Sequence, residues 1–342
     1  MSAVPGDVAA LAPLLEERLP ALGRGVTIAP FGGGQSNPTF LALGSGGEAV
    51  LRVQPAGKRL KGAHAVDREF RVMAALHGSR VPVPEMLLSG GEDEWLDRRF
   101  IVMQRVEGVV FWDPALPDKT PAERGRVYDA MVTVLADLHD VDIASVGLSD
   151  YGRPGNYFAR QFATWQRQYR ASETGENRDM EQLIAWLDRH LPEDDGTVSL
   201  VHGDYRIDNL IFDPEVLAIR AVLDWELSTL GHPFADLAYQ CMQWRLPNDG
   251  VFKGLGGVDR EALGIPDEAA YLAAYCRRRG LARIEGWTFH LAFSFFRLAA
   301  ILQGIYRRYL DGNAANAETA LRYGQTVPVL TALAMAEVER GG

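Results

Sequence analysis

The segment from Val201 to Asn209, taken together with the segment from Ala221 to Glu226, constrains this chain more than any other feature. The first reads Val-His-Gly-Asp-Tyr-Arg-Ile-Asp-Asn and places Asp204 five positions before Asn209. The second reads Ala-Val-Leu-Asp-Trp-Glu, and its Asp224 comes twenty positions after Asp204. Because a short apolar run precedes each acidic residue, we expect both carboxylates to lie where strands end.

Three short strands are expected around these carboxylates, at 199–201, 210–212 and 221–223. Asp213-Pro214 is a turn signal between the second and the third strand, so these two strands are predicted to form a hairpin. A hairpin beside a strand end can gather the two acidic groups into one cleft. Each fragment alone is weak evidence, because His-Gly-Asp occurs in many loops and an Asp after an apolar pair can simply end a strand.

Phosphoryl transfer needs the residue types that this combination supplies. One carboxylate orients the attacking hydroxyl and takes its proton, while an amide oxygen and a second carboxylate hold the magnesium ions that neutralise the triphosphate. The spacing of His202, Asp204 and Asn209 fits the H-x-D-x-x-x-x-N pattern of kinase catalytic loops. The sequence therefore predicts a site for phosphoryl transfer.

The order of the predicted elements indicates an α+β protein with two lobes. After a helix at 8–22, five strands and one helix make a small antiparallel sheet lobe, with the strands at 26–30, 39–43, 49–53, 86–89 and 99–104 and the helix at 64–77. A larger, mainly helical lobe follows, with helices at 121–139, 155–170, 177–190, 234–244, 267–279, 286–309 and 315–339. We place the nucleotide-binding lobe at residues 1–105 and the catalytic and substrate lobe at residues 106–342.

A glycine-rich loop, Phe31-Gly32-Gly33-Gly34-Gln35-Ser36-Asn37, joins the first two strands of the small lobe. It does not open a helix, which excludes both a Walker A loop and a Rossmann turn. Without Cβ atoms in the way, backbone N–H groups at such a hairpin tip can approach phosphate oxygens. Gly33, Gly34, Ser36 and Asn37 are therefore predicted to cover the nucleotide phosphates, and a merely flexible hairpin is the alternative.

A kinase also needs a cation on the third strand that pairs with an acid on the next helix. Arg52 occupies the strand position and Glu69 the helix position. An arginine can bind a carboxylate with two parallel hydrogen bonds and face the α- and β-phosphates, although the usual residue is lysine. Lys58 or Lys61 is the alternative cation, and the alternative for Glu69 is a solvated helix face.

Composition narrows the remaining classes. The net charge of −10 argues against a nucleic-acid-binding surface, which would show clustered Lys and Arg. The two cysteines form no C-x-x-C pair and no basic, apolar leader opens the chain, so we expect a reduced, cytoplasmic protein with no membrane partner. The apolar run 291–305 contains Arg297 and is too short for a membrane span, which favours a buried core helix. The oligomeric state, monomer or homodimer, stays open.

At these motifs the chain resembles the aminoglycoside phosphotransferase and choline kinase group, the small-molecule branch of the protein-kinase-like fold. The resemblance covers about residues 26–310. Within this group, the chain is similar in particular to the kinase-like N-terminal region of two long animal acyl-CoA dehydrogenases. The residues that carry it are Val50-Leu51-Arg52, Ala63-His64-Ala65-Val66-Asp67-Arg68-Glu69, Gly147-Leu148-Ser149-Asp150-Tyr151-Gly152 and Leu223-Asp224-Trp225-Glu226-Leu227-Ser228-Thr229-Leu230-Gly231-His232-Pro233.

The resemblance implies an ATP- and Mg²⁺-dependent phosphotransferase and gives roles to individual residues. It implies that Asp204 is the catalytic base, that Asn209 and Asp224 bind magnesium, and that Asp236 is a structural acid behind the catalytic loop. Gln104 to Val106 would supply backbone contacts to adenine. A hydroxylated acyl group or its CoA thioester is the acceptor that the related subgroup suggests.

The acceptor is predicted to be a small molecule that is anionic or carries an anionic group. Arg206 lies inside the catalytic loop and could meet that group or the transferred phosphoryl group. Other candidates for the acceptor pocket are the aromatic or polar residues Trp112, Asn156, Tyr157, Phe158, Trp165 and Tyr169 and the interleaved Arg160, Arg167 and Arg170. The alternatives are a catalytically weak pseudokinase, an aminoglycoside or amino-alcohol kinase, and a metal-dependent hydrolase that uses His202, Asp204, Asp224 and His232.

Overall fold

The computed structural model describes residues 4–31, 37–55, 66–91, 96–313 and 316–341. The chain divides into two compact units. Unit 1 comprises Met1–Val109, Ala144–Leu148 and Asn209–Ser228, and unit 2 comprises Val110–Ile143, Ser149–Asp208 and Thr229–Gly342. The sequence-based division at residues 105 and 106 assigns all of the second and third segments of unit 1 to the larger lobe, and it stays a prediction about domain boundaries.

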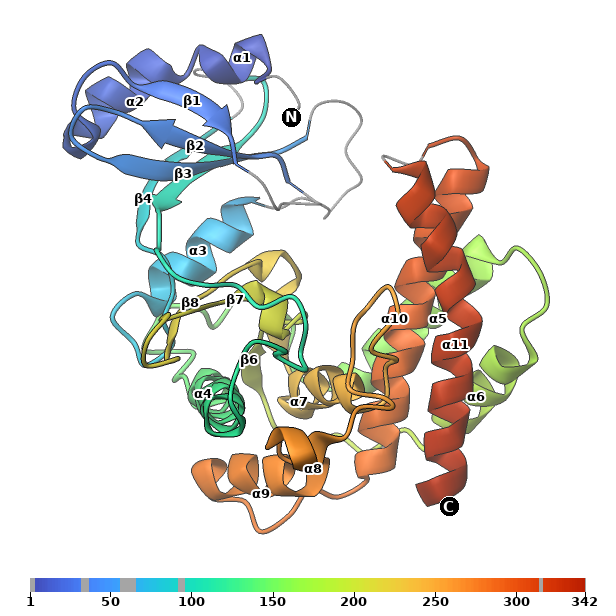
Figure 1. The fold of residues 1–342 in the computed structure, drawn as a ribbon. Coiled ribbons are helices and arrows are strands. Elements are labelled where there is room, and N and C mark those ends of the chain that lie inside the picture. The colour runs from blue at the N-terminus through green and yellow to red at the C-terminus, as the bar shows by residue number, and fades with distance from the viewer. Residues whose placement is uncertain (1–3, 32–36, 56–65, 92–95, 314–315, 342) are drawn as a thin grey trace. The chain divides into compact units, whose positions relative to one another are not determined.

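Unit 1 is built on a five-stranded antiparallel sheet (Figure 1). The strands, in the order β1-β2-β3-β5-β4, are β1 (Thr27–Pro30), β2 (Thr39–Leu43), β3 (Glu48–Val53), β5 (Phe100–Gln104) and β4 (Met86–Gly90). Helix α3 (Val66–Leu76) follows β3 in the chain. The strands β3 and β5 are buried along almost their whole length, and β3 buries the charged Arg52 among apolar residues. The predicted small antiparallel sheet with one helix is confirmed.

The N-terminal segment covers this sheet, but the single helix predicted at 8–22 was wrong. It is broken into α1 (Gly6–Ala9), α2 (Ala12–Arg18) and the 3₁₀ helix η1 (Pro20–Leu22). Pro13 lies in the first turn of α2 and Pro20 opens η1. Proline lacks an N–H and its ring clashes with the carbonyl four residues earlier, so each proline starts a new helix. The apolar side chains still pack into one core with β2, β3 and β5.

Unit 1 also contains a short hairpin next to Asn209 and Asp224. It pairs β7 (Leu210–Phe212) with β8 (Ile219–Val222), so the predicted hairpin is confirmed, with its second strand two residues earlier. The 3₁₀ helices η2 (Ile207–Asn209) and η3 (Trp225–Leu227) flank the hairpin. The Leu223 N–H donates to the Asn209 carbonyl at 2.9 Å, which places Asn209 next to the residue that precedes Asp224.

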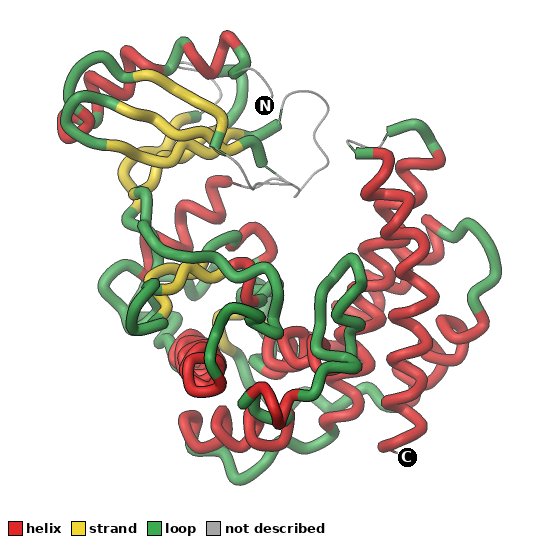
Figure 2. Tube along the Cα trace, in the orientation of Figure 1, coloured by secondary structure: helices red, strands yellow, loops and turns green. Residues whose placement is uncertain are grey.

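Unit 2 is mainly helical, and Figure 2 shows the predominance of helix there over its two short strands. Its helices are α4 (Pro121–His139), α5 (Tyr157–Ser172), α6 (Arg178–Arg189), α7 (Phe234–Cys241), the 3₁₀ helix η4 (Met242–Trp244), α8 (Arg260–Leu263), α9 (Glu268–Arg279), α10 (Trp287–Leu310) and α11 (Ala317–Gly341). The predicted helices are confirmed to within about two residues at each end. The segment predicted as one helix at 234–244 continues from α7 into η4, and α8 was not predicted.

Helix α10 is the core of unit 2, where it packs against α5, α6, α7 and α11. Figure 1 shows α10 and α11 lying side by side along most of their length. Among the described residues, α10 is the one helix long and apolar enough to cross a membrane, and 78% of its apolar window is buried within the structure. This burial confirms the prediction that 291–305 belongs to a core helix.

Candidate active site

The predicted catalytic loop leaves strand β6 (Ser199–Val201), which pairs with β9 (Thr229–Gly231) in unit 2. A buried carboxylate orders the loop: the backbone N–H groups of His202 and Gly203 donate to Asp236 at 2.5 and 2.7 Å. Gly203 has φ +84°, a left-handed conformation that favours glycine. Asp236 in the first turn of α7 therefore fixes the turn that presents Asp204.

His139 holds the other side of this carboxylate. Its Nε2 lies 3.4 Å from Asp236 Oδ2, and its Nδ1 lies 2.7 Å from the Tyr275 hydroxyl. Burial alone would raise the pKa of Asp236, but His139 and the backbone donor of His202 hold that pKa below its ordinary value. The folded loop thus stabilises the ionised form of Asp236.

This arrangement predicts an acid-dependent contribution to stability. Asp236→Asn keeps one acceptor oxygen but turns an amide toward a backbone donor, so we expect it to lower the free energy of unfolding by roughly 1–3 kcal/mol at pH 7. Since the folded-state pKa is depressed, the contribution is present above the unfolded pKa of about 3.9 and is lost as pH falls through the folded value. Urea unfolding at a series of pH values measures it.

The exposed Asp188→Asn on α6 is the matched control and should leave the urea midpoint unchanged at every pH. A difference between wild type and Asp236→Asn that stays constant down to pH 3 would show that the Asp236 charge contributes nothing.

Arg206 forms a fork with Asp208 within the catalytic loop. Its Nε donates to Asp208 Oδ1 at 2.9 Å, and its Nη2 donates to Asp208 Oδ2. Burial would lower the pKa of Arg206, but the carboxylates of Asp204 and Asp208 raise it. Its guanidinium also lies over the ring of Phe252, 5.1 Å from the ring centroid. The positive charge of Arg206 is therefore already compensated inside unit 2.

Tyr239 of α7 is a neighbour of the proposed base that the sequence did not point to. It is 6% exposed and lies close enough to Asp204 to feel its charge. Burial, together with the Asp204 charge, raises the pKa of Tyr239, which keeps its hydroxyl protonated. Asp204 thus has a protonated neighbour from a second element of its own unit.

In unit 1, Arg52 of β3 binds two carboxylates. Its Nη1 lies 2.6 Å from Glu69 Oε1 and its Nη2 lies 2.8 Å from Asp224 Oδ1. The predicted Arg52–Glu69 ion pair is therefore present, and Glu69, 1% exposed, is not on a solvated face. The contact with Asp224 was not predicted, because no sequence pattern relates β3 to the end of β8.

The pKa shifts follow from this burial. Burial would lower the pKa of Arg52, but Glu69 and Asp224 raise it above its ordinary value. For Glu69, burial raises the pKa to about 7; Arg52 opposes this shift and the carboxylates of Asp224 and Glu226 add to it. Arg52 is thus a fixed cation that binds the carboxylates of Glu69 and Asp224 and interacts with the charge of Glu226.

Asn209 and Asp224 lie at the same end of the β7–β8 hairpin, as the backbone bond between Asn209 and Leu223 requires. Asp224 has φ +64°, a left-handed conformation that is uncommon for residues other than glycine and is concentrated at functional sites. Their amide and carboxylate oxygens are the hard donors that Mg²⁺ prefers. Among the residues that the structure describes, no group of three or more His, Cys, Asp or Glu could hold a metal, so the rest of a magnesium shell would come from phosphates and water.

The predicted nucleotide contacts divide into described and undescribed residues. The buried Asn37 donates from Nδ2 to Glu226 Oε2 at 3.2 Å. The Gln104 N–H donates to the Glu85 carbonyl at 2.8 Å, which leaves the half-buried Val106 as the candidate for a backbone N–H to adenine. The predicted residues Gly33, Gly34 and Ser36 and the alternative cations Lys58 and Lys61 lie outside the described residues.

The structure separates the residues predicted for the acceptor pocket. Arg160 donates to the backbone carbonyls of residues 153 and 154, and Arg170 pairs with Glu173 and Glu181. Arg167 is exposed on α5, and Trp112 is 65% exposed. Asn156, Tyr157 and Phe158 line a different pocket. The ring of Trp165, another residue of the predicted set, contacts the guanidinium of Arg297 on α10.

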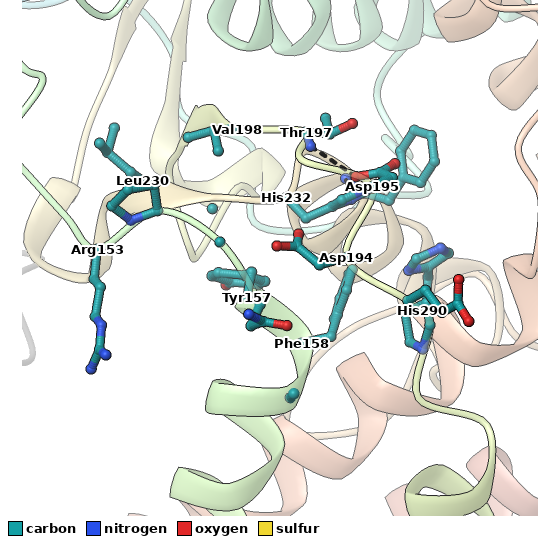
Figure 3. Close-up of a pocket in the computed structure, with 18 of the residues that line it drawn as sticks. Arg153, Tyr157, Phe158, Asp194, Asp195, Thr197, Val198, Leu230, His232 and His290 are labelled. Atoms are coloured by element: carbon teal, nitrogen blue, oxygen red, sulfur yellow. Dashed lines mark hydrogen bonds and ion pairs between the residues drawn. The ribbon is translucent and has the colours of Figure 1, made fainter.

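That different pocket, of about 340 Å³, lies wholly within unit 2 (Figure 3). Its walls include Thr197 and Val198, which precede β6, and Gly231 and His232, which end and follow β9. It is therefore at the opposite end of the β6–β9 ribbon from Asp204. His232 accepts the Phe234 N–H and faces Asp195 in this pocket, so it cannot join His202 in the metal-dependent hydrolase considered from the sequence.

The fold and these residues define the class of the protein as a kinase-like, small-molecule phosphotransferase. Residues 27–288 match the model of the phosphotransferase enzyme family, and the chain belongs to that family. A putative aminoglycoside phosphotransferase from Ralstonia eutropha shares 44% sequence identity over 97% of this chain and 98% of its own, with a TM-score of 0.87. The fold is also shared with the hygromycin B-bound aminoglycoside phosphotransferase APH(4)-Ia, at a TM-score of 0.62 and 17% identity.

The curated relatives are much longer than this chain. Mouse acyl-CoA dehydrogenase family member 10 is 45% identical over 89% of this chain and 28% of its own length. The probable acyl-CoA dehydrogenase IBR3 of Arabidopsis thaliana is 40% identical over 92% of this chain and 40% of its own length. The chain thus spans less than half the length of these relatives, and the predicted relationship to the kinase-like region of acyl-CoA dehydrogenases is confirmed.

Proposed function

We propose that this protein transfers the γ-phosphate of ATP, with Mg²⁺, to the hydroxyl group of a small acceptor that is a hydroxy acid or a hydroxyacyl-CoA. The observation that carries the proposal is the ordered His202–Asp204 turn on Asp236, because such a turn presents one carboxylate while its backbone is held rigid. The hard oxygens of Asn209 and Asp224 at one hairpin end support the metal requirement.

Each residue has a role that follows from its chemistry. Asp204 accepts a hydrogen bond from the acceptor hydroxyl and takes its proton as the oxygen attacks. Asn209 and Asp224 would hold magnesium, which neutralises charge on the triphosphate when bound. Arg52 keeps the Asp224 carboxylate in position and supplies a positive charge toward the α- and β-phosphates.

Replacement of Arg52 tests its role at the nucleotide. Arg52→Ala removes the cation between the buried Glu69 and the half-buried Asp224, so the apparent KM for ATP should rise by about 10-fold or more, as expected for a lost charge-assisted hydrogen bond. Arg52→Lys keeps the charge but loses the fork and should retain part of the activity. Steady-state kinetics against ATP measures both.

The control is Arg99→Ala, because Arg99 is exposed and pairs with Asp67. If Arg52→Ala and Arg52→Lys had the same KM for ATP as Arg99→Ala, the role of Arg52 at the nucleotide would be contradicted.

A second candidate function has one observation in its favour. Arg52 stands where kinases commonly carry lysine, and it binds Asp224 directly, which is an arrangement that a nucleotide-binding pseudokinase could keep. Nucleotide binding without turnover would distinguish that function from an enzyme.

An acceptor screen tests the proposed function. ADP release and acceptor phosphorylation are measured with Mg-ATP over hydroxy acids, hydroxyacyl-CoAs, amino alcohols and aminoglycosides. We expect the fastest turnover with a hydroxy acid or hydroxyacyl-CoA. Faster turnover with an aminoglycoside or amino alcohol would replace the proposed acceptor class, and ATP binding without phosphorylation of any acceptor would favour the pseudokinase.

A further inference from the structure

Arg297 of α10 is a buried arginine that forms no ion pair with a carboxylate of the described residues. It is 6% exposed, and among the residues that the structure describes its guanidinium has no hydrogen bond and no ion pair. Other buried arginines of unit 2 do have hydrogen-bond or ion-pair partners. Arg124 donates to the carbonyls of residues 115, 116, 117 and 263, and Arg245 pairs with Glu268 and Glu337. A guanidinium that has no partner in the described part of the chain and whose nitrogens are not sealed from solvent can bind a ligand that supplies an anion.

Two aromatic rings hold the guanidinium in place. Its Cζ lies 5.8 Å from the ring centroid of Trp165 and 5.5 Å from that of Tyr239. Cation–π contacts offset part of the desolvation of an arginine but leave its five donors unused. Trp165 on α5 and Tyr239 on α7 therefore fix the orientation of Arg297 without neutralising it.

The position of Arg297 relates it to the proposed base. Tyr239 contacts Arg297 with its ring, and the charge of Asp204 acts on the hydroxyl of the same tyrosine, so Tyr239 is a neighbour of both the guanidinium and the proposed base. Arg206 is closer in sequence to Asp204, but its charge is compensated by Asp204 and Asp208. Of these two arginines, Arg297 is the one whose donors have no partner among the described residues.

We infer that Arg297 binds the anionic group of the acceptor and thereby holds the acceptor hydroxyl at Asp204. This inference rests on the proposed function and narrows it to acceptors that carry a negative charge within a short chain of the reacting hydroxyl. A carboxylate matches the planar fork of arginine, and a phosphate of a CoA thioester offers the same kind of oxygen pair. Arg297, rather than Arg206, is thus the specificity-determining cation.

The test compares Arg297→Met and Arg297→Lys with wild type on matched acceptors. The acceptors are a hydroxy acid, its uncharged primary amide, and the CoA thioester of the same acid. We expect Arg297→Met to raise the KM for the charged acceptor about 10- to 100-fold, the range for a lost hydrogen bond to a charged group, and to leave the KM for the amide unchanged. Arg297→Lys should recover part of the affinity. Sensitivity of the free acid identifies the carboxylate as the bound group, and sensitivity of the thioester alone identifies a phosphate.

The control Arg307→Met is on the same helix, where Arg307 is exposed and pairs with Asp311, and it should behave as wild type. Thermal unfolding of each variant shows whether the fold is retained. Equal KM values of wild type, Arg297→Met and Arg297→Lys for the charged acceptor would overturn the inference while leaving Asp204-dependent transfer, and so the proposed function, intact.

Direct binding separates this result from a failure of the proposed function. Titration of the hydroxy acid without ATP should change the fluorescence of Trp165 in wild type, and the change should be lost in Arg297→Met and in Trp165→Phe. If no acceptor is phosphorylated but this binding is present, the proposed function fails and the anion site stands. If the hydroxy acid and the thioester both leave the fluorescence unchanged in wild type, the anion site is refuted.

Discussion

Replacing Asp204 with Asn is expected to lower kcat for acceptor phosphorylation by ~10²–10⁴-fold, the usual range for loss of a general base. The amide keeps the shape of the side chain, but it cannot take the proton of the acceptor hydroxyl. Because Asp204 faces the acceptor in this account, nucleotide affinity should change little. Steady-state kinetics and calorimetric titration with Mg-ATP measure the two effects separately.

The exposed Asp188→Asn on α6 serves as the control and should keep full activity. A kcat for Asp204→Asn within about threefold of wild type would remove Asp204 from the chemistry, since general-base effects are much larger than that.

Asp224→Ala is expected to abolish the magnesium dependence of ATP binding. The carboxylate is the stronger of the two predicted magnesium ligands, so Asn209→Ala should weaken binding less. The substitution also takes one of the two carboxylate partners from Arg52, which would then bind Glu69 alone. Calorimetry with ATP in Mg²⁺ and in EDTA gives the difference for each variant.

Equal affinities of wild type and Asp224→Ala for Mg-ATP would contradict the assignment. A loss of affinity that is the same with and without Mg²⁺ would instead assign Asp224 to the positioning of Arg52 alone.

Local patterns predicted most of the fold. Turn signals such as Asp213-Pro214 and the short apolar runs around them gave the β7–β8 hairpin, and long periodic segments gave the helices of unit 2. The failures have physical reasons. The apolar spacing at 8–22 outweighed Pro13 and Pro20, which break the helix, and the three-residue strand β9 exists only through its pairing with β6.

The site was predictable where it depends on one stretch of chain. The His202–Asp204 turn and the pairing of Arg52 with Glu69 follow from motif spacing. The contact of Arg52 with Asp224 and the proximity of Tyr239 to Asp204 could not be predicted, because they join elements far apart in the sequence. Arg297 did leave a signal, as a charge inside the apolar run 291–305, but periodicity alone assigns such a residue to a core helix.

The most direct test of the central claim is mass spectrometry of the acceptor after incubation with Mg-ATP whose γ-phosphate carries ¹⁸O. The account predicts that wild-type protein yields a hydroxy acid or hydroxyacyl-CoA bearing the labelled phosphoryl group on its hydroxyl oxygen, and that Asp204→Asn yields almost none. Labelled inorganic phosphate with no phosphorylated acceptor, or equal product from both proteins, would contradict it.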